Sequence, residues 1–162
     1  MSTRTPSSIA CTFELKLAIN RHIDASTLFA SPEGTDMHYS RLCALLIDCR
    51  TSDLNEAARF WGEALGRPVD PHHPGSRGNY LMLESPPDEP IVQIQRVDHE
   101  SRVHIDIETD DIPAEVVRLT NLGAKVVDRL ERWVVMEAPT GQRFCVVRVQ
   151  RPGFPKNANH WD

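Results

Sequence analysis

The amino-acid sequence predicts an α+β fold made of two pseudo-symmetric β-α-β-β-β modules, and three observations support this prediction. First, residues 103–108 alternate strictly between apolar and polar side chains, as in a strand with one buried face. Second, residues 47–54 resemble residues 105–112 at an offset of 58 positions. Third, the helix predicted after each of these stretches ends in Leu-Gly, at 65–66 and at 122–123. One supersecondary unit is therefore used twice.

The strand predicted at 103–108 has an unusual polar face. Its apolar side carries Val103, Ile105 and Ile107, and its polar side carries His104, Asp106 and Glu108. An imidazole and two carboxylates in a row are a high density of titratable groups for an ordinary solvated strand. After this strand, Asp110 and Asp111 supply helix N-cap chemistry, and Pro113 suits the first turn of a helix that runs to about Leu122.

The remaining elements follow the same order in both modules. In the first module we expect strand 42–49, helix 53–65 and strands 67–70, 79–84 and 91–97. In the second module we expect strand 103–108, helix 112–122 and strands 124–130, 132–137 and 143–149. The modules therefore span 41–100 and 101–162, the latter with a C-terminal tail that shows no hydrophobic period.

An N-terminal arm, residues 1–40, belongs to neither repeat. The apolar residues Phe13, Leu15, Leu17 and Ile19 alternate with more polar ones, which fits an amphipathic edge strand. An accessory strand, a partner-docking arm and a disordered leader all remain open for this segment.

Composition narrows the class of protein. The 162 residues carry a net charge of −5, which argues against a nucleic-acid surface and favours neutral or cationic ligands. No apolar run approaches the roughly 20 residues that span a membrane, and Glu14 and Lys16 interrupt the candidate signal segment. The four cysteines show no C-x-x-C spacing. We expect them to be reduced and the protein to be cytoplasmic.

Each helix is expected to cover the outer face of its sheet, because a small sheet cannot bury both faces alone. The inner faces then meet or enclose a cavity. The polar side of strand 103–108 points there, so the expected architecture is an incomplete, strongly curved barrel around one polar cleft.

Several segments together carry a family resemblance. They are His104–Asp111, Ala58–Gly66, Leu122–Val126, Ala138–Cys145 and the tail 151–159. Through them, residues 41–160 resemble the glyoxalase / bleomycin-resistance / dioxygenase group, the vicinal oxygen chelate superfamily. The resemblance implies the fold. It does not specify a reaction, because this superfamily includes isomerases, lyases, epimerases, dioxygenases, thiol transferases and drug-sequestering proteins.

The resemblance also implies four metal-ligand positions on the inner faces, and most have lost their strong ligands here. His104 matches the second-module histidine, whereas its first-module counterpart is Leu46. Cys145 stands at the final carboxylate position, and Gln93 and Gln95 are the candidates on the first module's last strand. A hard-cation site is thus not expected, and no cofactor is predicted. A His/Cys zinc site is conceivable with a third ligand from Asp106 or the His72-His73 loop.

Candidate roles follow for the cleft residues. His104 is a candidate general base, since the imidazole reference pKa of about 6.5 suits proton transfer near neutral pH. Asp106 and its repeat partner Asp48 are candidates for contacting a cationic ligand, and Glu108 is expected to face solvent at the mouth. Trp133 is a candidate aromatic wall, and Cys145 a weaker candidate nucleophile.

Three functions compete on this sequence. The first is a metal-independent small-molecule binder of the bleomycin-resistance kind, with Leu46, Asp48, Gln93, Gln95, His104, Asp106, Trp133 and Cys145 around the ligand. The second is a metal-independent enzyme that uses His104 for proton transfer. The third is a metal-dependent lyase, isomerase or dioxygenase-type enzyme, which the missing ligands disfavour. We further expect a homodimer and no nucleic-acid or membrane partner.

Overall fold

The structure is a computed structural model of the chain, and it describes residues 37–162. The alternating segment from Phe13 to Ile19 lies outside the described residues. Within the described part, the elements are β1 (His38–Cys49), α1 (Leu54–Leu65), β2 (Val69–Asp70), β3 (Tyr80–Leu83), β4 (Ile91–Arg96), β5 (Arg102–Thr109), α2 (Ile112–Asn121), β6 (Lys125–Arg129), β7 (Trp133–Glu137), β8 (Arg143–Arg148) and β9 (Asn159–Trp161). The predicted α+β class is confirmed.

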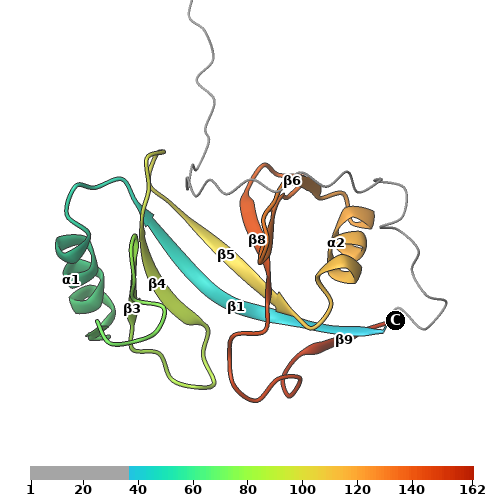
Figure 1. Cartoon of the computed structure of the whole chain (residues 1–162), viewed down its shortest axis with the longest axis horizontal. Coiled ribbons are helices and arrows are strands. Elements are labelled where there is room, and N and C mark those ends of the chain that lie inside the picture. The colour runs from blue at the N-terminus through green and yellow to red at the C-terminus, as the bar shows by residue number, and fades with distance from the viewer. Residues whose placement is uncertain (1–36) are drawn as a thin grey trace, which may run out of the picture. The chain divides into compact units, whose positions relative to one another are not determined.

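The nine described strands form one sheet in the order β2-β3-β4-β1-β5-β8-β7-β6, and β9 pairs with β1. The long strands β1 and β5 cross the middle of this sheet side by side, with α1 to one side of them in the view and α2 above the other part of β1 (Figure 1). They run antiparallel, whereas β1–β4 and β5–β8 are parallel. Each half therefore contributes the same arrangement of strands around the central pair.

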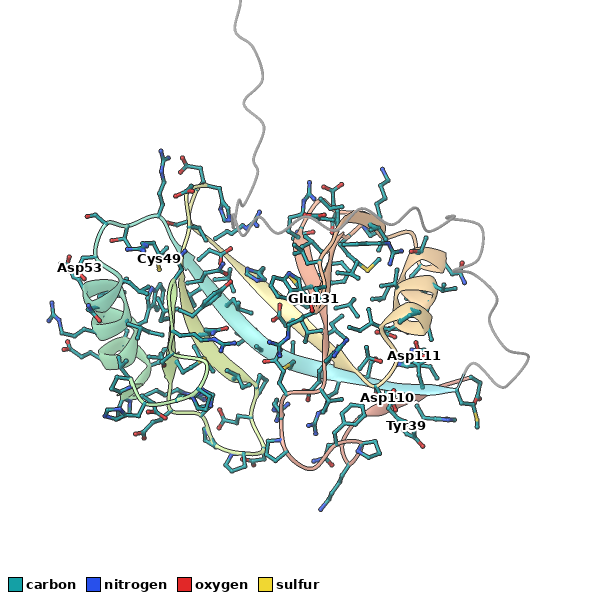
Figure 2. The ribbon with its side chains drawn as sticks, in the orientation of Figure 1. Tyr39, Cys49, Asp53, Asp110, Asp111 and Glu131 are labelled. Carbon is teal, nitrogen blue, oxygen red and sulfur yellow. The ribbon has the colours of Figure 1, made fainter. Side chains whose placement is uncertain are left out.

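Both helices begin and end where the local sequence predicts. The Asp53 side chain accepts hydrogen bonds from the backbone N–H groups of Asn55 and Glu56 at the start of α1. Asp111 accepts one from Ala114 at the start of α2. Figure 2 shows both aspartates at the beginning of their helices. Gly66 ends α1 in the left-handed region, at a φ of 65°, which a residue with a Cβ adopts only at a cost.

Two apolar clusters fix the helices to the sheet. The cluster between α1 and the sheet consists of Ile47, Leu54, Ala58, Leu83, Val92 and Ile94. The cluster between α2 and the sheet consists of Val116, Leu119, Ala124, Val134, Met136, Phe144 and Val146. Since side chains alternate along a strand, the intervening residues point to the other side of the sheet. We call that side, which carries Leu46, Asp48, His104, Asp106 and Cys145, the helix-free face.

The helix-free face has a small apolar cluster of its own. Cys43, Ala44, Leu46 and Val147 are buried together, with Tyr80, Ile91 and Cys145 packed against them. Leu46 is only 4% exposed. The middle of this face is therefore partly filled by the protein's own side chains.

The C-terminal tail adds a strand that the sequence pattern did not predict. Residues 38–40 extend β1 beyond the expected start at Leu42 and pair with residues 159–161 of β9. The Trp161 indole N–H donates to the Ser40 hydroxyl (2.8 Å), and the Arg118 guanidinium lies 3.9 Å from the centroid of the Trp161 ring. The tail thus covers the edge of β1 that β4 does not reach.

A search of the helices in the described residues finds none that is long and apolar enough to cross a bilayer.

Candidate functional site

His104 is held by a buried carboxylate from the neighbouring strand. The β1–β5 register pairs Leu46 with His104 and Asp48 with Arg102, which brings the Asp48 side chain beside the imidazole. His104 Nδ1 lies 2.9 Å from Asp48 Oδ2, and Arg102 Nε donates to the same oxygen at 3.2 Å. His99 Nε2 is 3.7 Å from it. Asp48 is 1% exposed, so these contacts hold its charge in the interior.

Asp106 lies on the other side of the imidazole. Its Oδ1 is 3.8 Å from His104 Nε2. The parallel β5–β8 register places Cys145 opposite Asp106. Burial raises the pKa of the Asp106 carboxyl to about 6, although the charge of His104 and a hydrogen bond from Cys145 oppose this. Burial and then the neighbouring Asp106 raise the pKa of the Cys145 thiol, so Cys145 is a poor nucleophile as it stands.

Two carboxylate oxygens in this cluster are buried without a hydrogen bond. Within residues 37–162, neither Asp48 Oδ1 nor Asp106 Oδ1 has a hydrogen-bond partner. A buried acceptor that stays unpaired costs about 1–3 kcal/mol, and more when it is charged. The two oxygens belong to the carboxylates on either side of His104, so the cluster has unused capacity to accept hydrogen bonds or to bind a cation.

The donor set of the cluster fits a zinc ion. One ligand atom from each of His104, Asp106 and Cys145 lies within 4.8 Å of the others. Histidine, carboxylate and thiolate are zinc's usual ligands, and three protein ligands with one open position are the pattern of catalytic sites. Asp48, bonded to the other imidazole nitrogen, is the kind of partner that orients a ligating histidine. Leu46 offers no ligand atom at the opposing position, which disfavours an oxygen-rich site.

The other predicted site residues are not part of this cluster. Gln95 lies opposite Asp48 but donates from its side-chain amide to the Tyr80 hydroxyl (3.1 Å). Gln93 lies opposite Leu46, and both glutamines are half-buried. Trp133 begins β7 opposite Val147, two strands from β5, and its role as an aromatic wall stays a prediction.

The His72-His73 loop is outside the cluster as well. Both histidines are exposed, and their contacts are local. The His73 ring accepts a hydrogen bond from the backbone of Gly75, and the His72 backbone donates to Asp70. Between the two third ligands that the sequence left open, only Asp106 lies beside His104.

The expectation that Glu108 faces solvent was wrong. Glu108 is 0% exposed and accepts hydrogen bonds from Arg41 Nε (2.6 Å) and from the backbone N–H groups of Gln150 and Arg151 (2.6 and 2.9 Å). Arg41 in turn donates to three backbone carbonyls of the tail, those of Arg151, Pro152 and Lys156. Glu108 therefore holds the tail and leaves Arg102, His104 and Asp106 as the other polar groups of its strand on this face.

Sequence reasoning also missed two members of the cluster, Arg102 and His99. Arg102 has the same parity along β5 as His104 and Asp106, so the alternation could have placed it on the same face. His99 comes from the β4–β5 connection, and no sequence pattern indicated its contact with Asp48.

Comparisons with known proteins agree with this fold. A protein family described as "Glyoxalase-like domain" matches residues 44–147. The Mn(II)-bound glyoxalase from Novosphingobium aromaticivorans is similar at a TM-score of 0.50 and 17% identity, over 69% of this chain and 40% of that one. A search of curated protein sequences found no match.

Two further solved structures are more distant. An extradiol ring-cleaving dioxygenase from B. fuscum has a TM-score of 0.48 and 13% identity, over 75% of this chain and 34% of that one. Methylmalonyl-CoA epimerase from Mycobacterium tuberculosis has a TM-score of 0.44 and 16% identity, over 67% of this chain and 87% of that one. This chain thus spans less than half the length of the glyoxalase and the dioxygenase.

Proposed function

The chain belongs to the glyoxalase-like domain family of the vicinal oxygen chelate superfamily, and on that basis we propose that it binds a small molecule rich in hydrogen-bond donors on its helix-free face. In this proposal His104 accepts a proton from the bound molecule or returns one to it. The activity is thus of the isomerase or lyase type, without a required metal.

The observation that carries the proposal is the pair of unpaired carboxylate oxygens, Asp48 Oδ1 and Asp106 Oδ1. Acceptors in this state gain most from a ligand that brings hydroxyl, amine or guanidine hydrogens. The carboxylates also favour a neutral or positively charged ligand over an anion. Together they support a ligand that bridges the two sides of His104.

The contact with Asp48 suits His104 to proton transfer. A carboxylate can only accept, so Nδ1 carries the hydrogen in the His104–Asp48 bond, and the neutral form of this imidazole has its free lone pair on Nε2. Nε2 is the atom that faces Asp106 at 3.8 Å. Asp106, with a pKa of about 6, can hold a proton near neutral pH. One group can therefore remove a proton while the other supplies one.

The packing of the helix-free face favours a small ligand over a bulky drug. Leu46 and Val147 are buried against Cys43 and Ala44, where a wide apolar cavity would otherwise open. A drug-sized molecule usually buries most of its surface in a pocket of several hundred Å³. We therefore propose a compact polar ligand and do not extend the proposal to drug sequestration.

A second candidate function is a zinc centre on His104, Asp106 and Cys145, which the closeness of their ligand atoms favours. A bound zinc ion supplies Lewis-acid polarisation of a substrate oxygen. In that case Asp48 keeps the imidazole oriented, and Cys145 must release its proton despite its raised pKa. The same donors suit zinc better than Mn(II), because manganese prefers oxygen ligands.

We also propose a reducing compartment such as the cytoplasm. Cys43, Cys49 and Cys145 are all free thiols in the described part of the chain.

Two measurements on the full chain test the proposal. Elemental analysis after purification without chelators should find far less than one equivalent of transition metal. Thermal-shift assays should show saturable stabilisation by methylguanidine or ethanolamine and none by acetate, and Asp106→Asn should remove it. Stoichiometric zinc would establish the second candidate instead. Absence of both metal and stabilisation would contradict both functions.

A further inference from the structure

Two arginines, Arg132 and Arg148, line one depression beside the start of α2. The β7–β8 register ends at the pair Trp133–Val147, and Arg132 and Arg148 are the next residues beyond this pair. Alternation along β8 puts Arg148 on the same face as Val146, under α2, and Arg132 reaches the same depression from the β6–β7 turn. Two guanidinium groups at one depression repel each other. This pair therefore has an electrostatic cost that some other group can relieve.

No described carboxylate relieves it. Seven other arginines in residues 37–162 form an ion pair with a carboxylate, namely Arg41, Arg50, Arg59, Arg67, Arg102, Arg118 and Arg143. Neither Arg132 nor Arg148 has a described carboxylate within 4.0 Å. Of the thirteen arginines in residues 37–162, six therefore lack such a partner, and Arg132 and Arg148 are two of these six that line the same depression.

The first half of the sheet contains an arginine, Arg96, that is satisfied by a neutral acceptor. The β3–β4 register pairs Tyr80 with Gln95, so the next rung pairs Asn79 with Arg96. There the Asn79 side-chain oxygen accepts hydrogen bonds from Arg96 Nη2 (2.6 Å) and Nε (3.2 Å). Within residues 37–162, the side chains of Arg132 and Arg148 have no described hydrogen-bond acceptor of this kind. An anion at Arg132 and Arg148 would supply the missing acceptor oxygens.

The arginine pair lines a depression with apolar walls. Its volume is ≈ 670 Å³, and Ile112, Pro113 and Leu130 line it together with Arg132 and Arg148. It lies between the start of α2, marked by Asp111 in Figure 2, and the β6–β7 turn, marked by Glu131. The corresponding depression at Arg96 is smaller, ≈ 300 Å³. The larger volume is in the range of small-molecule sites.

Acidic residues at the same depression limit the charge of its ligand. Asp110 Oδ1 accepts from the backbone of Tyr39 and Asp111 Oδ1 from that of Ala114, so each carboxylate is partly engaged. Together with the exposed Glu131 they still oppose a polyanion. A single carboxylate, by contrast, matches two adjacent guanidinium groups well.

We propose that this depression binds a small monocarboxylate with an apolar body. The carboxylate receives hydrogen bonds from Arg132 and Arg148, and the apolar body packs against Ile112, Pro113 and Leu130. The site is on the opposite face of the sheet from His104, so it is independent of the proposed function.

Benzoate is the probe for this site, and neutral benzamide is its matched control. In NMR spectra of the full chain, benzoate should shift the Nε–Hε signals of Arg132 and Arg148 saturably, with a Kd on the order of 1 mM. Benzamide should bind the unmodified chain at least about tenfold more weakly than benzoate does. Benzoate should bind the Arg148→Gln variant at least about tenfold more weakly than it binds the unmodified chain. The matched variant Arg96→Gln in the first half should bind benzoate like the unmodified chain.

A second variant separates binding from folding. Arg132→Asn removes one of the two like charges, so it should raise the melting temperature by about 2–4 °C while abolishing benzoate binding. The proposal is overturned if benzoate causes no saturable shift, or if benzamide binds equally well. Inorganic phosphate that competes as well as benzoate would overturn the assignment of an apolar body.

Discussion

Asp106 is the residue whose protonation is most sensitive to its surroundings. Burial raises its pKa to about 6, against about 3.9 in an unfolded chain. Between these pH values the folded chain keeps a proton that the unfolded chain has released. The free energy of unfolding therefore falls as pH rises through this window and stays low above it.

Asp106→Asn should remove this dependence. Relative to the variant, the chelator-treated unmodified chain should lose about 2–3 kcal/mol of unfolding free energy between about pH 4 and about pH 7.5. Urea unfolding of both proteins at the two pH values measures the difference. If the unfolding free energies of the two proteins change equally between these pH values, Asp106 titrates normally in the folded chain.

For the individual residues, the sequence identified the members of the site better than it identified their contacts. Alternation placed His104 and Asp106 on one face, and the 58-residue repeat pointed to Asp48. It could not show that Asp48 bonds His104, because that contact depends on the register of β1 against β5. For Glu108 the alternation led to a wrong prediction of solvent exposure, because its partner Arg41 lies 67 residues earlier in the chain.

Among the elements, the C-terminal tail depends most on a single ion pair. Glu108 and Arg41 are almost fully buried, and their remaining hydrogen bonds go to the tail backbone. Removing one partner of a buried pair leaves an uncompensated charge, which costs about 3–5 kcal/mol. The exposed Arg50–Glu100 pair, with side chains 60% and 90% exposed, is the matched contrast.

Glu108→Ala should therefore lower the unfolding free energy by about 3–5 kcal/mol, and Glu100→Ala by less than about 1 kcal/mol. Hydrogen exchange should also accelerate at the backbone N–H groups of Gln150 and Arg151 in the first variant only. Equal effects of the two substitutions in urea unfolding would show that Glu108 does not anchor the tail.

The elements themselves were largely predictable, and the exceptions have a physical reason. Aspartate caps and Leu-Gly ends marked both helices, and alternation marked β5. The short strand β9 has no hydrophobic period, because it is held by pairing with residues 38–40 and by the Trp161 contacts. Such long-range pairing leaves no local signal in the sequence.

For the whole molecule, we propose a homodimer. Val103 is 60% exposed on the helix-bearing face of the central strand β5, and Ile105 beside it is 38% exposed. Apolar groups in this position are often covered by a second copy. Light scattering should give twice the 18.3 kDa mass of the chain at micromolar concentration.

Deletion of residues 1–36 tests whether the N-terminal arm takes part in this assembly. A truncated chain that remains dimeric would exclude the arm as the dimerisation element, and a monomeric full chain would contradict the dimer itself. Val103→Lys should weaken a dimer formed through β5, because it places a charge in the proposed contact.

The central claim is that Asp48, His104 and Asp106 form a site for a donor-rich small molecule. The most direct measurement is the ¹⁵N NMR spectrum of the His104 ring during titration with methylguanidine in metal-free protein. The claim predicts saturable shifts of both ring nitrogens, no response to acetate, and loss of the response in Asp106→Asn. Ring signals that do not change with methylguanidine, in a chain that remains folded, would contradict it.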